Sequence, residues 1–248
     1  MLIAHLSDLH LRHHLPGSAA IPARRSRVMP ELLARALGLI GQAHPDLLVL
    51  SGDLLDYPLD QLEESAIQEL GEQDLRLIAG ILTRAPCPVV AVPGNHDHMG
   101  LMQRVFGHLP KDQVVAGHRV LTFWDTENAH HVPKRVGDER RRFQRALADA
   151  AAGGALPQIH VQHYLVWPER NDDYPHTYGD GADLREAIAA SGRVRLVLSG
   201  HYHRGEPPLA EKGAYFATVP AFCEAPHPIW LYQLAGDAVH WRALQVEA

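Results

Sequence analysis

The chain has 248 residues, which suits one large domain or two small ones, and its 23 Lys and Arg against 29 Asp and Glu give a formal net charge of −6. Hydrophobic residues make up 46% and charged residues 21%, which excludes a disordered or collagen-like chain. The acidic balance argues against a stable complex with nucleic acid, because such binding needs a clearly basic surface. A local phosphate site remains compatible with it.

Cysteine usage and hydropathy narrow the class further. The two cysteines, Cys87 and Cys223, give neither a disulfide framework nor a thiolate metal site. No apolar run reaches the length of a membrane span, and the first residues lack the basic region of a signal peptide. We therefore expect a cytoplasmic protein without membrane attachment. Histidine is unusually frequent, with 18 residues, which prompts a search for metal ligands.

Short apolar segments alternate with longer helical patterns, which is typical of an α/β protein. The first part of the chain is predicted to form, in order, a strand over 2–6, a helix over 30–43, a strand over 46–51, a helical stretch over 59–84 and a strand over 88–92. A break of the long helical stretch near Gly71 is left open. Both faces of the strand at 46–51 are apolar, so we expect it in the interior of a sheet.

The second part of the chain continues this alternation and then changes character. The predicted elements are a strand over 114–122, a helix over 138–151, a strand over 157–162, a helix over 182–190, a strand over 194–198 and three closely spaced antiparallel strands over 215–219, 229–234 and 238–244. No repeat or linker divides the sequence, so we expect a single domain over residues 1–248. Two long loops, 11–29 and 164–181, are either functional binding loops or surface excursions.

Potential metal ligands follow five of the predicted strands, at the ends where α/β sheets bind their ligands. In chain order the motifs that contain them are Asp8 and His10; Gly52 and Asp53; Gly94, Asn95, His96 and Asp97; His163; and Gly200, His201 and His203. The shorter motifs arise easily by chance, but Gly-Asn-His-Asp is expected in roughly one such sequence in a thousand. Turn and capping roles could explain each residue alone. The ordered series favours a metal site.

This series resembles the motifs of the calcineurin-like metallophosphoesterases, and within them the compact bacterial phosphodiesterases of the cyclic-nucleotide type. The resemblance extends from residue 8 to residue 203, with no motif missing. It implies an α/β fold, a four-layer sandwich of two mixed β-sheets flanked by helices, around a two-metal centre. It also implies that one metal is held by Asp8, His10, Asp53 and His203, and the other by Asp53, Asn95, His163 and His201, with Asp53 bridging.

The chemistry of these ligands agrees with the resemblance. Carboxylate, amide and imidazole groups without thiolate suit Mn²⁺, Fe or Zn²⁺ better than Ca²⁺. Two divalent ions with the carboxylates of Asp8 and Asp53 and a bridging hydroxide leave a local charge of about +1. An acidic protein can therefore still present a cationic pocket to phosphate.

The resemblance also implies a mechanism in which two metals hold the phosphate and a metal-bridging hydroxide attacks it. His96 is not needed as a ligand. By resemblance it lies beside the leaving group as a general acid or phosphate contact, and Asp97 would orient its ring.

We therefore expect a dinuclear metal-dependent hydrolase of small phosphate esters, a phosphodiesterase whose substrate class includes nucleotides. The alternatives are a phosphomonoesterase acting on nucleotides or phosphoproteins, a nuclease, and a non-catalytic metal-binding scaffold. A scaffold has no need of His96 beside seven intact ligands, and 248 residues leave little room for a DNA-gripping domain. The oligomeric state is left open.

Structural roles are also considered for three further groups of residues. Four arginines on the predicted helix 138–151 are expected on a solvated face rather than in a nucleic-acid patch. His160 precedes His163 by three residues, so we expect it to pack on the opposite face of its strand. Base stacking and simple packing are both open for the tyrosines, Tyr57, Tyr164, Tyr174, Tyr178 and Tyr202.

Overall fold

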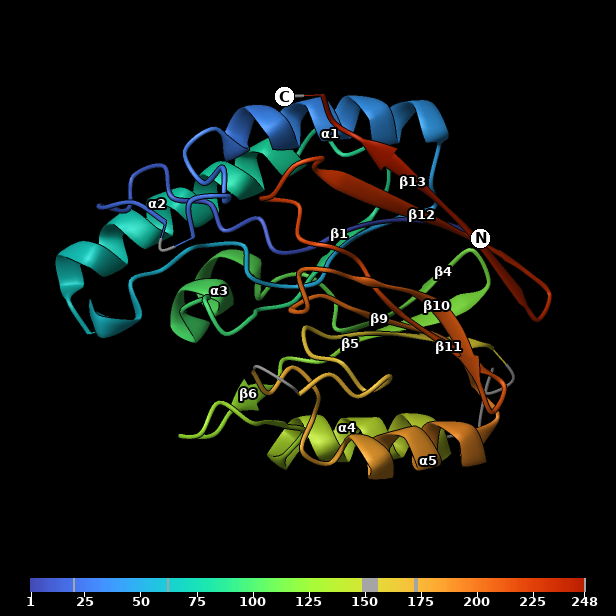
Figure 1. Ribbon diagram of the computed structural model, residues 1–248. Helices are drawn as coiled ribbons and strands as arrows, with labels where there is room; N and C mark the ends of the chain where they lie inside the picture. Colours follow the sequence, from blue (N-terminus) through green and yellow to red (C-terminus); the bar gives the residue numbers. More distant parts are fainter. Residues whose placement is uncertain (20, 62, 149–155, 172–173, 248) are drawn as a thin grey trace.

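The computed structural model describes residues 1–19, 21–61, 63–148, 156–171 and 174–247. Two mixed β-sheets pack face to face, and a layer of helices covers the outer face of each (Figure 1). The four-layer α/β sandwich expected from the sequence is confirmed. None of the described helices is both long and apolar enough to cross a membrane.

The first sheet has the strand order β13-β12-β1-β2-β3. Its parallel part consists of β1 (Leu2–Leu6), β2 (Leu47–Leu50) and β3 (Val89–Ala91). The hairpin of β12 (Pro228–Ala235) and β13 (Ala238–Gln245) adds antiparallel to β1. All four residues of β2 are buried, as expected for a strand with two apolar faces.

The second sheet has the order β10-β11-β9-β8-β5-β4. Its central strands run parallel: β11 (Ala214–Thr218), β9 (Val194–Ser199), β8 (Gln158–Val161) and β5 (His118–Thr122). The antiparallel edges are β10 (Glu206–Glu211) and β4 (Asp112–Val115). A separate two-stranded pair is formed by β6 (Thr126–Glu127) and β7 (Pro133–Lys134).

Helices α1 (Met29–Ala43) and α2 (Ser65–Leu82) cover the first sheet, with α3 (Met99–Phe106) packed on α2 (Figure 1). Helices α4 (Gly137–Ala148) and α5 (Gly181–Ser191) cover the second sheet. Side chains of β8 alternate between the two faces of the second sheet. Ile159 and Val161 pack in the core between the sheets, whereas His160 packs between Phe123 and Phe143 beneath α4. The packing role expected for His160 is confirmed.

The stretch predicted as helical over 59–84 divides before Gly71 rather than at it. A short 3₁₀ turn spans Leu59–Gln61, and α2 then runs unbroken through Gly71. A Cβ at this position would come within 2.7 Å of the Tyr57 ring, so the glycine lets that ring pack directly on the helix.

Two strand predictions were wrong. The segment 114–122 forms two strands, β4 and β5, because Ala116 and Gly117 adopt φ angles of 45° and 76° and turn the chain back. Of the three antiparallel strands expected at the end, β12 and β13 form a hairpin, whereas β11 lies in the second sheet, antiparallel to β10 on one side and parallel to β9 on the other.

The helix α3 and the strand β10 were not predicted from the sequence. In β10, Pro207 and Pro208 interrupt the strand pattern. The end of the helix predicted over 138–151 lies outside the described residues beyond Ala148.

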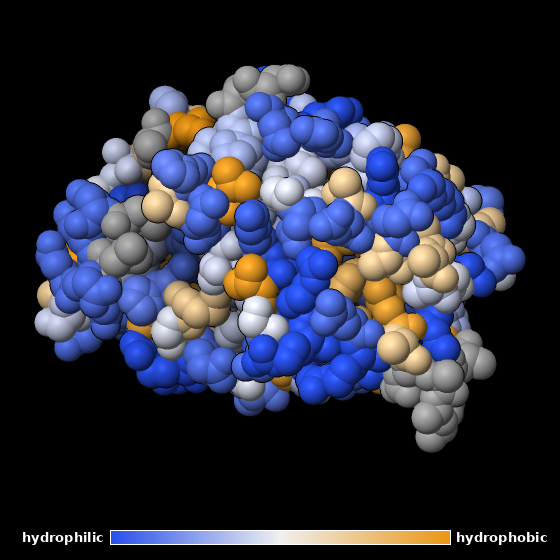
Figure 2. Space-filling view, turned by 90° about the horizontal axis from the view of Figure 1, so that it is seen from below, coloured by the Kyte–Doolittle hydropathy of each residue, from blue (hydrophilic) through white to orange (hydrophobic). Residues whose placement is uncertain are grey.

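The outer face of the α4–α5 layer is mainly hydrophilic (Figure 2). The arginines of α4 on this side are paired with acidic groups: Arg140 with Asp180, Arg141 with Asp138, and Arg142 with Glu139. These ion pairs neutralise much of the positive charge, which supports the reading of a solvated face over a nucleic-acid patch.

Candidate metal centre

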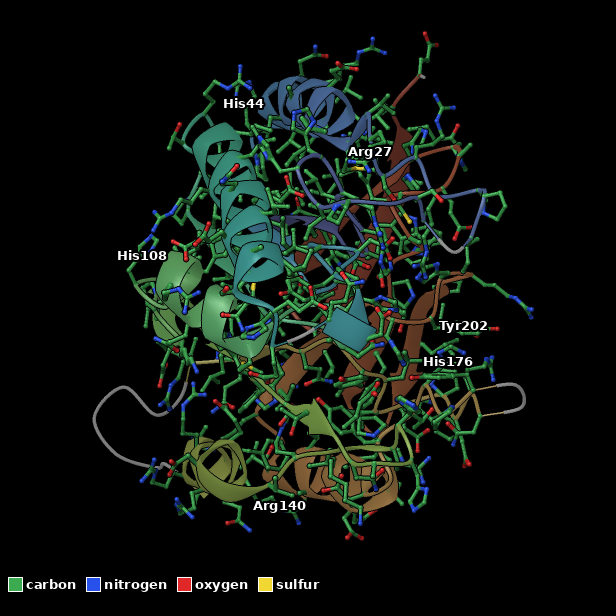
Figure 3. The ribbon with its side chains drawn as sticks, turned by 90° about the vertical axis from the view of Figure 1, so that its left-hand side faces the viewer. Arg27, His44, His108, Arg140, His176 and Tyr202 are labelled. Atoms are coloured by element: carbon green, nitrogen blue, oxygen red, sulfur yellow. The ribbon has the colours of Figure 1, made fainter. Side chains whose placement is uncertain are left out.

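The seven predicted metal ligands follow the carboxyl ends of parallel strands in the two sheets. The first strand, β1, runs from the right to the left of Figure 1, toward the side that faces the viewer in Figure 3. Because β1, β2, β3, β8 and β9 are parallel within their sheets, their carboxyl ends deliver the following loops to the same place. These loops carry Asp8 and His10, Asp53, Asn95, His163, and His201 and His203. Side chains up to 195 positions apart in the sequence are thereby brought within a few ångströms of one another.

Four of these side chains form a first group. The Nε2 atom of His10 lies 3.4 Å from Oδ2 of Asp53 and 3.9 Å from Oδ1 of Asp8. The Nε2 atom of His203 lies 3.2 Å from Nε2 of His10 and 3.5 Å from the same oxygen of Asp8. Each pair joins the atoms that would serve as metal donors.

A second group shares Asp53 with the first. Nε2 of His163 lies 3.5 Å from Oδ2 of Asp53 and 3.2 Å from Oδ1 of Asn95. The donor atoms of Asp53, His163 and His201 all lie within 4.8 Å of one another. The same carboxylate oxygen of Asp53 thus faces both groups.

The backbone is constrained where it presents these ligands. Asp8, His10, Asp53 and His201 have φ angles of 56°, 42°, 49° and 66°, in the left-handed region that non-glycine residues rarely adopt. Such strain accumulates at functional sites, where surrounding contacts hold it in place. Gly94 permits the close approach of the chain to Asp53, because a Cβ there would overlap with that carboxylate.

Hydrogen bonds outside the two groups orient the donor atoms. Nδ1 of His163 donates to the carbonyl oxygen of Ser51 at 2.7 Å, and Nδ1 of His203 donates to Oε1 of Glu224 at 2.8 Å. Since both acceptors lack a proton, the Nε2 atom of each ring is left to bind a metal. Oδ1 of Asp53 accepts from the backbone amide of His96 at 2.8 Å, which leaves its Oδ2 for the shared position.

Two donor atoms of this centre are buried without a hydrogen-bond partner among the described residues: Oδ1 of Asp8 and Nε2 of His201. Leaving such atoms unpaired in the interior is costly, so their arrangement calls for a ligand. The surrounding set of carboxylate, amide and imidazole donors suits a divalent transition metal. The residues therefore fit the dinuclear centre that the sequence indicated.

The electrostatics favour the ligand forms of the carboxylates. Burial raises the pKa of Asp53, but the imidazoles around it outweigh this effect and hold its pKa well below the ordinary range. Burial lowers the pKa of His163, but Asp53 and Asp8 outweigh it and raise that pKa to about 9. Burial lowers the pKa of His10 to about 4 against the pull of Asp56 and Asp53. Metal binding would thus displace a proton from His163.

His96 lies at the border of the centre, where its side chain is 25% exposed. Its ring packs edge-on against His10 with centroids 4.8 Å apart, and its Nδ1 atom lies 3.6 Å from Oδ1 of Asp56. The orienting contact expected from Asp97 is not observed. The Asp97 carboxylate instead accepts hydrogen bonds from the backbone amides of Leu54, Leu55 and Gly94. Asp97 joins two loops of the site, and Asp56 faces the ring.

Sequence reasoning missed Asp56 and Glu224. Asp56 is held by Arg12 through Nε at 3.1 Å and Nη2 at 2.8 Å, and by Arg24 through Nη1 at 3.0 Å. Its position three residues after Asp53 was the available signal. Glu224 comes from the segment after β11, beyond the last motif, where no pattern marked it. The buried thiol of Cys223 also lies near His10 and His203, and its burial raises the thiol pKa.

Aromatic rings border the second group of donors. The rings of Tyr164, Tyr174 and His176 lie 4.9, 5.6 and 5.0 Å from the ring of His201. Tyr164 is buried, whereas Tyr174 is half-buried. His176 and Tyr202 lie side by side on the face that carries the centre, with ring centroids 5.1 Å apart (Figure 3). Tyr164, Tyr174 and His176 therefore form one wall of the site.

Comparisons with known proteins agree with this geometry. Residues 1–205 match the family described as calcineurin-like phosphoesterase. A protein of Synechococcus, named a probable cyclic nucleotide phosphodiesterase, is 29% identical over 213 residues, covering 82% of this chain and 73% of its own. A Coxiella burnetii protein with the same functional name is 24% identical over 231 residues, covering 89% and 83% of the two chains.

Two solved structures share the fold. A dimetal phosphatase from Danio rerio superposes with a TM-score of 0.70 at 14% identity, covering 99% of this chain and 98% of its own. A purple acid phosphatase from yellow lupin gives a TM-score of 0.61 at 10% identity, covering 99% and 51%. With the family match extending over most of the sequence and the strand-end residues meeting at one edge, the chain belongs to the calcineurin-like phosphoesterases and is a metal-dependent phosphoester hydrolase.

Proposed function

We propose that this phosphoesterase hydrolyses small phosphodiesters, with cyclic nucleotides as the substrate class, at a centre of two divalent metal ions. The observation that carries this proposal is the shared position of Asp53, whose Oδ2 atom faces His10 on one side and His163 on the other. The names of the Synechococcus and Coxiella relatives support the substrate class.

The proposed ligand sets follow from the two groups of donor atoms. One ion is held by Asp8, His10, Asp53 and His203, and the other by Asp53, Asn95, His163 and His201. The nitrogen and oxygen donors suit Mn²⁺, Fe or Zn²⁺. When bound, such a pair of ions supplies Lewis acidity toward phosphate oxygens and an activated water as nucleophile.

The remaining residues of the site protonate the leaving group or hold the metal ligands and their loops in position. His96 is the proposed general acid: its partly exposed ring lies at the border of the centre, and Asp56 faces its Nδ1 atom, which leaves Nε2 to hold the proton. Glu224 and the carbonyl of Ser51 fix the rings of His203 and His163. Asp97 ties the loop after β2 to the loop after β3.

A preference for diesters is supported by the names of the Synechococcus and Coxiella relatives, both of which are named probable cyclic nucleotide phosphodiesterases. The two cysteines are unpaired, which fits the cytoplasmic location inferred from the sequence.

The test is a comparison of bis-p-nitrophenyl phosphate with p-nitrophenyl phosphate, using protein stripped of metal and reloaded with Mn²⁺. Asp53→Ala is the control, because it removes the shared ligand. Faster metal-dependent cleavage of the diester supports the proposal and leads to a screen of cyclic nucleotides. Faster cleavage of the monoester would favour a phosphomonoesterase. No turnover of either compound with two metals bound would contradict the proposed activity.

A further inference from the structure

Described residues of the segment before α1 line an open pocket of about 250 Å³. The cavity is lined by residues within the segment 18–28, and three of them are Arg24, Arg25 and Arg27. We call it the arginine pocket. Three guanidinium groups in four positions stand out in a chain whose net charge is −6. Arg27 lies beside the start of α1, on the face that also carries the metal centre (Figure 3).

Polar groups of the arginine pocket are left without partners. Ser26 is 4% exposed, and its Oγ atom is buried with no hydrogen-bond partner among the described residues. The side chain of Arg24 is 7% exposed, and its Nε atom is likewise unpartnered. Buried donors of this kind are normally paired, so each of these two atoms lacks an acceptor that it would ordinarily have.

The three arginines differ in how many hydrogen bonds their side chains make within the protein. Arg27 donates to the carbonyl oxygens of His13 and Gly17 and so holds the loop together. Arg24 donates to Asp56. The side chain of Arg25 is exposed and makes no hydrogen bond or ion pair within the described ranges, while its backbone amide donates to the carbonyl oxygen of Cys223 at 2.8 Å. Arg24 and Arg27 are thus held in place by hydrogen bonds, whereas the Arg25 guanidinium group is available to a ligand.

Apolar groups complete the pocket. Ile21 is 42% exposed, one of the few large hydrophobic side chains on the described surface, and it lines the pocket together with Pro22 and Val28. A site that combines guanidinium groups, an unpaired hydroxyl and an apolar rim matches a ligand with an anionic head and an apolar body.

We propose that the arginine pocket binds a phosphate monoester of a small organic molecule, of the class of nucleoside monophosphates. The dianionic phosphate is held by Arg25 with Arg24 and Ser26, and the organic part lies against Ile21 and Pro22. This site is separate from the metal centre and does not depend on the catalytic proposal. Its link to the centre is the ion pair of Arg24 with Asp56, whose other contacts include His10 and His96.

Calorimetric titration of the Mn²⁺-loaded protein with adenosine 5′-monophosphate tests the proposal. We expect one binding event that survives Asp53→Ala, which removes the shared metal ligand, and that weakens about 10- to 100-fold in Arg25→Glu, because a charge-assisted contact is lost and reversed. Arg25→Lys should retain much of the affinity. Adenosine without phosphate should not bind at this site.

Arg141→Glu is the matched control, since Arg141 is also an exposed arginine but lies on α4 and does not line the pocket. It should leave the Arg25-dependent event unchanged, and thermal melts should show that all variants are folded. Binding that is abolished by Asp53→Ala and unaffected by Arg25→Glu would overturn the proposal. If the metal centre binds no monoester, the binding event that depends on Arg25 should still be observed. The binding proposal and the catalytic proposal can therefore be tested independently.

Discussion

Glu224 accepts a hydrogen bond from Nδ1 of His203 at 2.8 Å, and this contact fixes which nitrogen of the ring faces the other donors of the centre. The carboxylate also raises the basicity of the imidazole, as partners of metal-binding histidines do. Burial lowers the pKa of His203, but Asp8 and Glu224 outweigh it and raise that pKa to about 9. Glu224 thus supports a ligand without being one.

Replacing Glu224 should therefore weaken metal binding rather than chemistry. We expect Glu224→Gln to lower Mn²⁺ affinity about 10- to 100-fold, with activity recovered at saturating metal. Titration of the stripped protein with Mn²⁺ measures the change. Glu186→Gln is the control, because Glu186 is an exposed carboxylate that pairs only with a surface lysine, Lys212, in the contacts of the described chain. Equal affinity in Glu224→Gln and wild type would refute the role.

His96 should matter most for poor leaving groups. His96→Gln is expected to slow hydrolysis of alkyl or nucleoside phosphodiesters about 100-fold or more, since a general acid protonates the departing alkoxide. The loss with bis-p-nitrophenyl phosphate should be much smaller, because p-nitrophenolate leaves without a proton. Steady-state kinetics with both substrates, with metal content measured in parallel, decide the point. The same loss with both substrates, or a matching loss of metal, argues against a general acid.

The metal-free protein should lose stability as the pH rises. The pKa of His163 in the fold is about 9, above its ordinary value of 6.5, so the folded state binds this proton more tightly than the unfolded chain does. The stabilisation is fully present below about pH 6.5 and is lost as the pH rises through about 9. A Tm lower by roughly 5 °C at pH 9.5 than at pH 6.5 is expected.

The metal-loaded protein provides the control for this pH dependence, because a metal replaces the proton on His163. Its Tm should vary less over the same range. An equal pH dependence with and without metal would show that other groups are responsible.

Gly94→Ala should disturb the centre directly. A Cβ at this position overlaps with the Asp53 carboxylate, so we expect destabilisation of about 1–3 kcal/mol and weakened metal binding. Gly38→Ala in α1 is the matched control: no atom lies within 4 Å of its added Cβ, and the change should stabilise the helix by about 0.5–1 kcal/mol. Chemical denaturation and metal titration of both variants measure these effects. Normal metal binding in Gly94→Ala would contradict this placement of Asp53.

The strand ends of this fold could be predicted because each buried strand is short, apolar and followed at once by a motif residue. β1 and β2 show this, with Asp8 and Asp53 close behind them. The residues that contact His203 and His96 were harder to predict, because these contacts arise from how separate segments fold together. Glu224 reaches His203 from the segment after β11, and Asp56 faces His96 because of how two loops fold together.

The sheet to which a strand belongs could likewise not be predicted from its local sequence. β11 has the length and composition of the other end strands, yet it lies in the second sheet, antiparallel to β10 and parallel to β9, and nothing within residues 214–218 indicates the parallel partner. The Asp97 prediction failed for a related reason. A carboxylate adjacent to His96 in sequence turns toward the free amides of Leu54 and Leu55, because those buried amides need an acceptor.

A crystal structure of the Mn²⁺-loaded protein, with data collected for anomalous scattering of manganese, tests the central claim most directly. We predict two manganese peaks about 3.5–4 Å apart that share Oδ2 of Asp53, one ligated by His10 and the other by His163. A single peak, or two peaks with no common contact to Asp53, would contradict the dinuclear centre.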